Sequence, residues 1–318
     1  MSMTVVVTGA CGWIGRAVCA CLQSKGITVI GADLTESDGP WDDFHCLDIT
    51  TTLDFFLSGI DTVIHCAGYA HRPNETPEEQ KMFYAVNRDG TRNMLEWSAR
   101  NGVERFLYVG SIASYDWKSA NGVAVAEEHP MQLETHYARS KQEGEQLVTE
   151  SALDWRVVRL ATVFGEGDPA NFSRMVHAIK RRLFFVPGRG IARKSVVPVD
   201  IAAELICRFA LEKSVPHRLI NLALPKAPSL AEICTAFHEV CGLSKVPRLP
   251  MPLVKALAVG GDLATAVLGR FPFSSRTLEK LVVSTEVSTE RMQECFPNQD
   301  FGSFRDELEK CKEYYISL

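Results

Sequence analysis

The sequence lacks the patterns that mark several classes of protein. It has 34 Lys and Arg against 39 Asp and Glu, and no long block of basic residues stands out. Nucleic-acid-binding domains usually carry a basic patch, so we expect no nucleic-acid partner. No uninterrupted apolar run approaches the roughly 18 residues of a membrane span. Met1 leads into Val5 without a charged leader or a cleavage site, and we therefore expect a cytoplasmic protein with no membrane partner.

Patterns of metal ligands are also missing. The chain has ten cysteines but no CxxC pair, and its eight histidines are scattered without an HxxxH spacing. A zinc site usually needs clustered ligands, such as two close cysteine pairs. We therefore predict no metal site and interpret the cysteines as reduced, mostly buried thiols.

The composition is that of an ordinary soluble globular protein. The chain has 318 residues, of which 46% are hydrophobic and 23% are charged. A chain of this length and hydrophobic content can form a sizeable core. Short β-branched runs alternate with longer amphipathic stretches through the first two-thirds of the chain. This alternation predicts an α/β fold with a Rossmann-type, doubly wound parallel sheet. The predicted strands are residues 4–8, 28–32, 62–66, 105–110 and 155–160, and the predicted helices are 14–25, 78–101 and 137–152.

A glycine-rich loop follows the first predicted strand and precedes a predicted helix. Its sequence is Thr8-Gly9-Ala10-Cys11-Gly12-Trp13-Ile14-Gly15, in which the glycines have the spacing GxxGxxG. Glycines permit a tight turn and a close backbone approach, so a pyrophosphate can sit on the N-terminus of the helix. We predict a dinucleotide site whose contacts include Gly9, Gly12, Trp13, Ile14 and Gly15.

An acidic residue ends the second predicted strand. Asp33 lies 33 − 15 = 18 residues after Gly15, close to the spacing of an acid that binds the adenosine ribose hydroxyls. A carboxylate repels a 2′-phosphate, which favours NAD over NADP, although the nearby Arg16 could accommodate a phosphate. Asp48 and Ile49 are candidates to flank the adenine, and a helix-capping role for Asp48 is an equally good interpretation.

The sequence Tyr137-Ala138-Arg139-Ser140-Lys141 is the strongest catalytic signal. Residues four apart share one face of a helix, so the Lys141 ammonium can sit beside the Tyr137 phenol. A phenol has a pKa near 10, and a neighbouring cation lowers it. Lys141 and an oxidised nicotinamide would supply that charge, so we predict Tyr137 as the catalytic base.

A hydroxyl group follows the fourth predicted strand. Doubly wound sheets place their ligands at the carboxyl ends of the strands. Ser111 stands at this position and could hydrogen-bond the substrate oxygen that Tyr137 deprotonates. Ser114, three residues later, is the competing candidate.

In this order, the glycine-rich loop, the strand-end acid, Ser111 and the YxxxK motif resemble the extended short-chain dehydrogenase/reductase family. The likeness covers nearly the whole chain and is supported by residues 65–68, 86–91, 159–165 and 197–202. It implies that NAD is the cofactor and that Lys141 also holds the nicotinamide ribose. It further implies a homodimer in which helices 78–101 and 137–152 form a four-helix interface. The other cofactor contacts that it implies are Ala67, Gly68, Asn87 and Val163.

The C-terminal part is most similar to the nucleotide-sugar epimerase and reductase group. The resemblance implies that Asn171 and Arg193 bind the diphosphate of a nucleotide sugar and that Arg276 also lies in the substrate site. A surface salt bridge is the alternative for each arginine. Residues 271–281 and 309–315 resemble the ends of bacterial surface-polysaccharide enzymes, which implies a role in polysaccharide biosynthesis.

The sequence pattern changes after Gly165, and this change predicts the domain organisation. A Gly- and Asp-rich loop follows, and the regular alternation of strands and helices ends there. We predict an NAD-binding Rossmann domain over residues 1–165, with return segments near 195–222. A smaller C-terminal α/β substrate-binding domain is predicted over residues 166–194 and 223–318.

The two residues that follow Ser111 disfavour several reactions of the family. Sugar 4,6-dehydratases that resemble this fold carry an Asp-Glu pair where this chain has Ile112-Ala113. Decarboxylases of the group have Glu at the place of Ala113, and 3,5-epimerase/reductases have Cys there. Hydride transfer at a carbinol is the chemistry that remains.

Three enzymatic hypotheses follow. The first is an NAD-dependent nucleotide-sugar 4-epimerase, and the second is an NAD(P)H-dependent 4-keto-sugar reductase that uses the same residues. The third is a hydroxysteroid-type dehydrogenase, supported by the apolar segments 86–95 and 253–268. Because Lys255 and Asp262 interrupt the second segment, we interpret it as a packed or lid-like helix, with a membrane-surface helix as the alternative. An NAD-sensing protein without activity is disfavoured, because Ser111, Tyr137 and Lys141 are all present.

Overall fold

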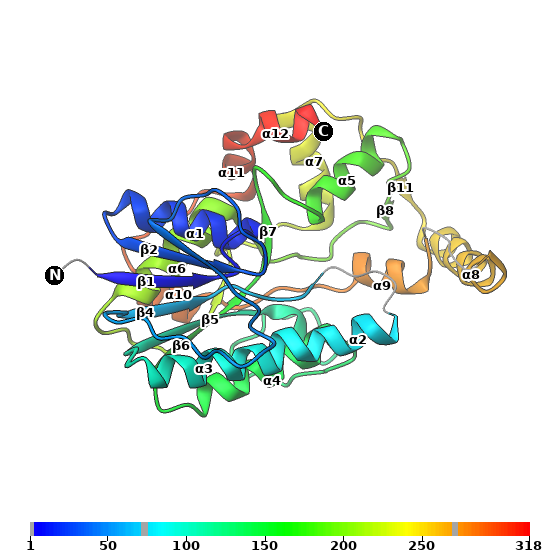
Figure 1. The fold of residues 1–318 in the computed structure, drawn as a ribbon. Coiled ribbons are helices and arrows are strands. Elements are labelled where there is room, and N and C mark those ends of the chain that lie inside the picture. Colours follow the sequence, from blue (N-terminus) through cyan, green and yellow to red (C-terminus); the bar gives the residue numbers. More distant parts are fainter. Residues whose placement is uncertain (1–2, 71–75, 269–272) are drawn as a thin grey trace.

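A parallel sheet of seven strands forms the centre of the molecule in a computed structural model that describes residues 3–70, 76–268 and 273–318 (Figure 1). The strand order is β10-β6-β5-β4-β1-β2-β3, and every pairing that the structure describes in this sheet is parallel. The predicted α/β, doubly wound fold class is therefore confirmed. The strands are β1 (Thr4–Thr8), β2 (Thr28–Asp33), β3 (Asp43–Cys46), β4 (Thr62–His65), β5 (Arg105–Ser111), β6 (Asp154–Leu160) and β10 (Leu219–Leu222).

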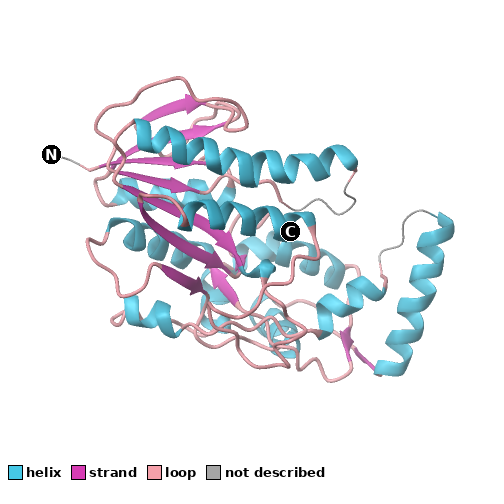
Figure 2. Ribbon diagram, turned by 90° about the horizontal axis from the view of Figure 1, so that it is seen from below, coloured by secondary structure: helices cyan, strands magenta, loops and turns pink. Residues whose placement is uncertain are grey.

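Helices cover both faces of this sheet (Figure 2). On one face α1 and α6 pack against the central strands, and on the other face lie α3 and α4. The strands are short apolar runs because parallel strands are buried on both sides. The main helices are α1 (Trp13–Ser24), α2 (Pro77–Tyr84), α3 (Thr91–Arg100), α4 (His136–Thr149), α5 (Asn171–Lys180), α6 (Val199–Leu211) and α7 (Leu230–Cys241).

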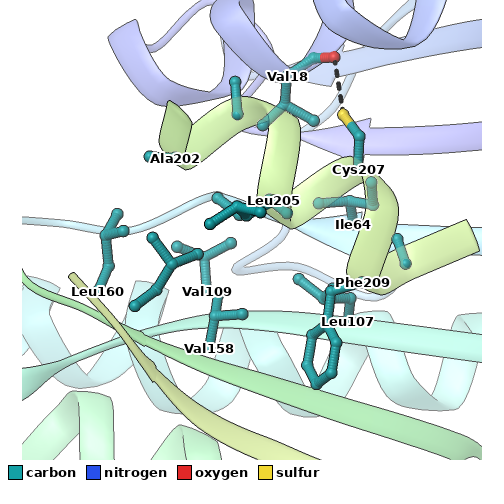
Figure 3. Close-up of a cluster of buried hydrophobic side chains, with 14 of the residues drawn as sticks. Val18, Ile64, Leu107, Val109, Val158, Leu160, Ala202, Leu205, Cys207 and Phe209 are labelled. Carbon is teal, nitrogen blue, oxygen red and sulfur yellow. Dashed lines mark hydrogen bonds between the residues drawn. The ribbon is translucent and has the colours of Figure 1, made fainter. Parts of the chain in front are cut away.

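The core between α6 and the sheet is closely packed (Figure 3). Leu205 and Phe209 of α6 meet Leu107 and Val158 of the strands, and all four side chains are fully buried. Burying side chains of this size contributes roughly 1.5–3 kcal/mol each. This layer holds the strand ends, and thus the loops that follow them, in a fixed arrangement.

The sequence predicted most of these elements but missed two features. The edge strand β3 was not among the predicted strands, because its four residues, DFHC, are exposed or half-buried and give little periodic signal. In the predicted return segment near 195–222, β9 (Val196–Pro198) pairs with β7 (Thr162–Phe164) outside the main sheet. A further small sheet joins β8 (Val186–Pro187) to β11 (Arg248–Leu249).

The predicted helix 78–101 contains a local widening. Between α2 and α3 the chain forms a π-helical segment, η1 (Ala85–Gly90). A Cβ at Gly90 would lie 2.8 Å from the side chain of Ile49, and a Cβ at Gly144 of α4 would lie 2.2 Å from the Asn87 carbonyl oxygen. The two glycines thus allow η1 to approach both the Ile49 loop and α4.

A buried ion pair fixes α4 to the sheet. Arg159 of β6 and Glu145 of α4 lie 2.6 Å apart, with side chains only 5% and 9% exposed. Arg159 also donates to the Tyr115 hydroxyl at 2.7 Å and to the Glu127 carbonyl at 2.6 Å. Desolvation opposes the charge of Arg159, but the hydrogen bonds and charge of Glu145 outweigh it and raise the pKa of the guanidinium.

The C-terminal part adds further helices outside the sheet. In both views α8 extends away from the sheet, with α9 beside it (Figures 1 and 2). Residues 269–272, which include the first part of the 271–281 segment noted above, lie outside the described residues. No helix in the described ranges is both long and apolar enough to span a membrane. These helices are α8 (Met251–Leu268), α9 (Ser275–Val282), α10 (Glu290–Cys295), α11 (Phe304–Lys310) and α12 (Lys312–Ser317).

The ten cysteines are free thiols with varied exposure. Cys19, Cys207, Cys234 and Cys241 are buried, and Cys46 is exposed. The other five are half-buried. Burial raises the pKa of Cys19 to about 12, so this thiol stays protonated and behaves as a small apolar group.

Replacing the acid of the buried pair tests its role. In Glu145→Gln the Arg159 guanidinium would remain buried without a counter-charge, and we expect the free energy of unfolding to fall by about 3 kcal/mol. Urea denaturation measures the change. The control is Glu309→Gln, which removes an exposed ion pair with Lys312 and should cost less than about 1 kcal/mol. Equal effects of the two substitutions would contradict the assigned role.

Candidate functional site

The glycine-rich loop joins β1 to α1 and lies against the end of β4. Gly9 has φ +68°, and a Cβ there would lie 2.7 Å from the Ala67 backbone. A Cβ at Gly15 would lie 2.0 Å from the Gly9 carbonyl oxygen. Only glycine fits either place, and the predicted neighbours Gly9, Gly15 and Ala67 are thus brought together.

The N-terminus of α1 is open to an anion. Gly12 is the N-cap, no side chain caps the helix in the described structure, and its first turn has no acidic residue. The first N–H groups of a helix have no partner within it, and the helix dipole adds positive charge there. Gly12 is exposed, and Trp13 and Ile14 are half-buried beside it. This cradle fits the diphosphate of a dinucleotide.

Asp33 lies at the rim of the same loop. Its carboxylate accepts hydrogen bonds from the Cys11 N–H at 2.9 Å and the Leu34 N–H at 2.7 Å. Arg16 is directed elsewhere, because its guanidinium donates to the Asp38 carbonyl and stacks over the Trp41 ring. Asp33, and not Arg16, is therefore the charged side chain that the described contacts hold at the end of β2.

Asp48 and Ile49 take local structural roles in this arrangement. The Asp48 carboxylate accepts from the backbone N–H and the hydroxyl of Thr50, at 2.9 and 2.7 Å. These bonds close a turn, which agrees with the capping interpretation of Asp48. Ile49 is 8% exposed and belongs to the core beneath the turn.

Asn87 clamps the loop after β4 to α4. Its amide oxygen accepts from the Tyr69 N–H at 2.7 Å, and its amide nitrogen donates to the Tyr69 carbonyl and to the Ser140 hydroxyl. Asn87 is fully buried, so these bonds hold Gly68 beside Lys141. Val163, predicted to contact the cofactor, lies in β7 and is 5% exposed within the core.

Ser111 and Tyr137 meet where β5 ends and α4 begins. Thr135 caps α4 by accepting from the Ala138 N–H at 3.1 Å, which places Tyr137 in the first turn. The Ser111 hydroxyl lies close enough to the Tyr137 phenol to lower its pKa. The rival candidate Ser114 is 4% exposed and donates to the Ala138 carbonyl, so it supports α4 instead.

Lys141 lies one turn farther along α4 and is only 5% exposed. Its ammonium donates to the Val109 carbonyl at 2.7 Å and lies 4.2 Å from the centre of the Tyr108 ring. Burial lowers the pKa of Lys141 to about 8. The sequence did not indicate either partner, because both lie on β5, more than 30 residues away.

Burial raises the pKa of Tyr137 above its usual value, and the interaction with Ser111 only partly opposes this. The sequence prediction was a pKa lowered by Lys141 together with an oxidised nicotinamide. In the described structure the Lys141 ammonium donates to the Val109 carbonyl. The lowering that depends on the nicotinamide stays a prediction.

A buried histidine that sequence reasoning missed supports the loop. His65 ends β4 and is bonded to the Thr8 hydroxyl at 2.7 Å and the Thr91 hydroxyl at 3.1 Å. Burial lowers its pKa to about 3, so the ring is neutral at physiological pH. His65 thus ties β1 to α3, and its place after a buried strand was the available signal.

The three predicted substrate residues lie in separate parts of the C-terminal region. Asn171 is exposed at the start of α5. Arg193 donates to the Ala227 carbonyl and lies 3.9 Å from the Glu286 carboxylate. Arg276 is exposed on α9. This ion pair of Arg193 is long and partly exposed, so it is weak and is compatible with both interpretations of Arg193.

Sequence reasoning missed the cations around Arg276. The pKa of Lys280 is lowered by desolvation and then by the like charges of Arg276 and Arg174, so these three side chains lie near one another. Lys194 donates to the Lys280 carbonyl at 2.8 Å and thus holds the end of α9. In the described ranges, no group of three or more His, Cys, Asp or Glu side chains is placed to hold a metal ion.

The buried Lys141 predicts a pH dependence of stability. An unfolded lysine has a pKa near 10.4, so between pH 8 and about 10.4 the unfolded state binds the proton more strongly. The free energy of unfolding should therefore rise between pH 8 and pH 10, by about 2 kcal/mol relative to Lys141→Met. Urea denaturation at pH 8 and 10 measures the difference. Lys194, whose pKa is also lowered to about 8, is present in both proteins and cancels; parallel profiles would contradict the prediction.

Two curated bacterial proteins are similar in sequence to this chain. An N-acetyl-alpha-D-glucosaminyl-diphospho-ditrans,octacis-undecaprenol 4-epimerase of Escherichia coli O157:H7 is 25% identical over 244 residues, covering 74% of this chain and 71% of that protein. A UDP-glucose 4-epimerase of Vibrio cholerae is 25% identical over 265 residues, covering 80% of this chain and 77% of that protein.

Solved structures share the fold over nearly the whole chain. A UDP-glucuronic acid 4-epimerase from Bacillus cereus, in complex with UDP-glucuronic acid and NAD, has a TM-score of 0.74 at 17% identity, covering 99% of each chain. A UDP-N-acetylglucosamine 4-epimerase from Methanobrevibacter ruminantium M1 has a TM-score of 0.75 at 18% identity, also covering 99% of each chain.

The family assignment rests on a direct match of the sequence. The family model described as "NAD dependent epimerase/dehydratase family" matches residues 5–223, which is more than half of the chain. This range contains the loop, Asp33, Ser111, Tyr137 and Lys141. The chain therefore belongs to the NAD-dependent epimerase/dehydratase family, whose members are enzymes of the extended short-chain dehydrogenase/reductase type with NAD as the cofactor.

Proposed function

We propose that the protein is a nucleotide-sugar 4-epimerase that keeps NAD bound through the reaction. The observation that carries this proposal is that the Ser111 hydroxyl and the Tyr137 phenol lie close enough to interact at the carboxyl end of the sheet, one helical turn from Lys141. This is the position at which open parallel sheets bind their ligands. The 4-epimerases among the relatives support the choice of reaction.

Each residue of this group has one task in the proposed reaction. Tyr137 accepts the proton of the sugar O4 hydroxyl, and Ser111 hydrogen-bonds the same oxygen and orients it. NAD, when bound, supplies the hydride acceptor for C4. The 4-keto sugar then turns over in the site, and Tyr137 returns the proton to O4 after the hydride has reached the other face of C4.

Electrostatics decides when Tyr137 can act. Because burial raises its pKa, the phenol is protonated at neutral pH and is a poor base. Positive charge beside the oxygen is needed to favour the phenolate. Lys141 is held in this neighbourhood by the Val109 carbonyl, and the bound oxidised cofactor adds the second positive charge.

The C-terminal region holds the substrate in this proposal. Asn171, Arg193 and Arg276 bind the diphosphate while the sugar turns, so anchoring and chemistry lie on different parts of the chain. The proposed division is an NAD-binding domain over residues 1–165, with segments near 195–222, and a substrate-binding domain over the remainder. A homodimer through α2, α3 and α4 belongs to the same proposal.

One measurement separates the epimerase from the reductase hypothesis. The protein is purified without added cofactor and denatured, and the released nucleotide is identified by mass spectrometry. Stoichiometric NAD supports the epimerase, because the same cofactor must take and return the hydride. An empty protein that binds NADH or NADPH reversibly would favour the 4-keto-sugar reductase or the hydroxysteroid-type dehydrogenase.

Removing the Tyr137 hydroxyl should abolish the reaction without removing the cofactor. We expect Tyr137→Phe to lower kcat by roughly 10²–10⁴-fold, as for the loss of a general base, with an unchanged NAD content. Conversion of UDP-glucose or UDP-N-acetylglucosamine to the 4-epimer is followed by chromatography. Tyr314→Phe, in α12, is the matched control and should retain activity; an active Tyr137→Phe would refute the proposed base.

Replacing Asp33 tests the preference between NAD and NADP. Asp33→Ala removes the carboxylate that we propose binds the ribose hydroxyls, so NAD affinity should fall about tenfold while NADP affinity rises. Calorimetric titration of the cofactor-free protein with each dinucleotide gives both values. Asp38→Ala is the control, because Asp38 receives Arg16 only through its carbonyl oxygen. An unchanged preference in Asp33→Ala would exclude the assignment.

A further inference from the structure

Most of the helix α8 surface is apolar and uncovered. Val254 and Ala258 pack against Leu278 of α9, with exposures of 0% and 1%. Elsewhere on the helix Leu253, Leu257 and Leu263 are 49%, 45% and 66% exposed. Among the described side chains, α8 is thus packed along one face, and other apolar side chains remain exposed.

The exposed face is nearly free of charge. The two charged residues in the segment 253–265 are Lys255 and Asp262. Asp262 is occupied, since its carboxylate accepts from the N–H and the hydroxyl of Ser275 and thereby holds the start of α9. An exposed apolar surface of this kind usually marks a site of interaction.

A groove of about 460 Å³ runs along this face. Its volume lies within the range of roughly 300–1,000 Å³ that is typical of sites for small ligands. The wall is almost wholly hydrocarbon and includes Phe185 and Phe273, whose rings pack edge to face at 5.1 Å. The groove is lined by Phe185, Leu253, Ala256, Leu257, Gly260, Gly261 and Phe273.

Helix α9 contacts both α8 and the segment that follows Ser111. On one side it contributes Leu278, which packs against α8. On another side Glu279 forms an ion pair at 3.3 Å with Lys118, which belongs to the segment that follows Ser111. The eight residues of α9 span about 12 Å. Helix α9 therefore lies between the apolar groove and the segment that follows β5.

Several cationic side chains lie on α9 and on the neighbouring helix α5. Arg276 and Lys280 of α9 are exposed, and Arg174 of α5 lies close enough to affect the pKa of Lys280. Clustered positive charges of this kind bind phosphate groups. The apolar groove and the cations thus lie on the neighbouring helices α8 and α9. An apolar groove beside clustered cations matches an amphiphile with a hydrocarbon chain and a diphosphate.

We propose that the α8 groove binds the isoprenoid chain of a polyprenyl-diphosphate-linked sugar and that Arg276, Lys280 and Arg174 bind its diphosphate. This inference rests on the proposed 4-epimerase chemistry and replaces the nucleotide by a lipid as the carrier of the sugar. The relative from Escherichia coli O157:H7, named for such a lipid-linked sugar, supports this carrier. A nucleotide would leave the apolar groove unused.

The test compares one sugar on two carriers. The NAD-loaded protein is assayed in detergent micelles with N-acetylglucosamine on undecaprenyl diphosphate and, separately, with UDP-N-acetylglucosamine. The groove variant is Leu257→Glu, and the control is Phe56→Glu, an equally charged change at a side chain that is 70% exposed between β3 and β4. We expect Leu257→Glu to lower kcat/KM for the lipid-linked sugar by roughly tenfold or more. The value for UDP-N-acetylglucosamine and the unfolding midpoint should stay the same.

Each other outcome contradicts the inference in a distinct way. An equal loss with both carriers would show that the groove acts through the reaction site and not on the lipid. Activity with the nucleotide sugar alone would refute the lipid carrier and leave the 4-epimerase intact. A change of molecular mass in Leu257→Glu, measured by light scattering, would assign the groove to a second copy of the chain. No epimerisation of either substrate by the NAD-loaded protein would refute the 4-epimerase proposal itself.

Discussion

The buried ion pair between Arg159 and Glu145 is the constraint on which the site depends. It joins the strand β6 to the helix that carries Tyr137 and Lys141, and it reaches the loop after Ser111 through the Tyr115 hydroxyl. Two charges removed from water are costly unless they are paired and further hydrogen-bonded. Arg159 meets this condition through three different elements, so α4 has one orientation relative to the ends of the strands. The Ser111–Tyr137 contact follows from that orientation.

The site combines two groups whose burial acts against their charged forms. Burial raises the pKa of the Tyr137 phenol and lowers that of the Lys141 ammonium to about 8. Both groups are therefore more easily neutral here than in water. A charged ligand between the glycine-rich loop and α4 changes this balance, because opposite charge in a dry site acts strongly on its neighbours. In the proposed function, Tyr137 and Lys141 thus link the reaction to the binding of the cofactor.

Much of the fold and part of the site could be predicted from local pattern. The alternation of apolar runs and amphipathic helices indicated the doubly wound sheet, and the spacing of Gly9 and Gly15 indicated the loop whose close contacts the structure contains. The edge strand β3, the π-helical segment η1 and the cations beside Arg276 gave no such signal. Each depends on neighbours that are distant in sequence, such as Ile49 for η1 and Arg174 for the α9 cluster.

The sequence by itself determined the class of the fold, the glycine-rich loop and the spacing of Tyr137 and Lys141, because these follow from periodicity and from backbone sterics within a few residues. Only the tertiary structure decided the partners of the charged groups. Lys141 bonds a carbonyl of β5, Asn87 holds the Tyr69 backbone, and the apolar face of α8 remains uncovered. These partners and this exposure depend on which surfaces meet when the helices pack on the sheet. Burial and electrostatic interaction are set by those contacts between distant residues, and not by spacing along the sequence.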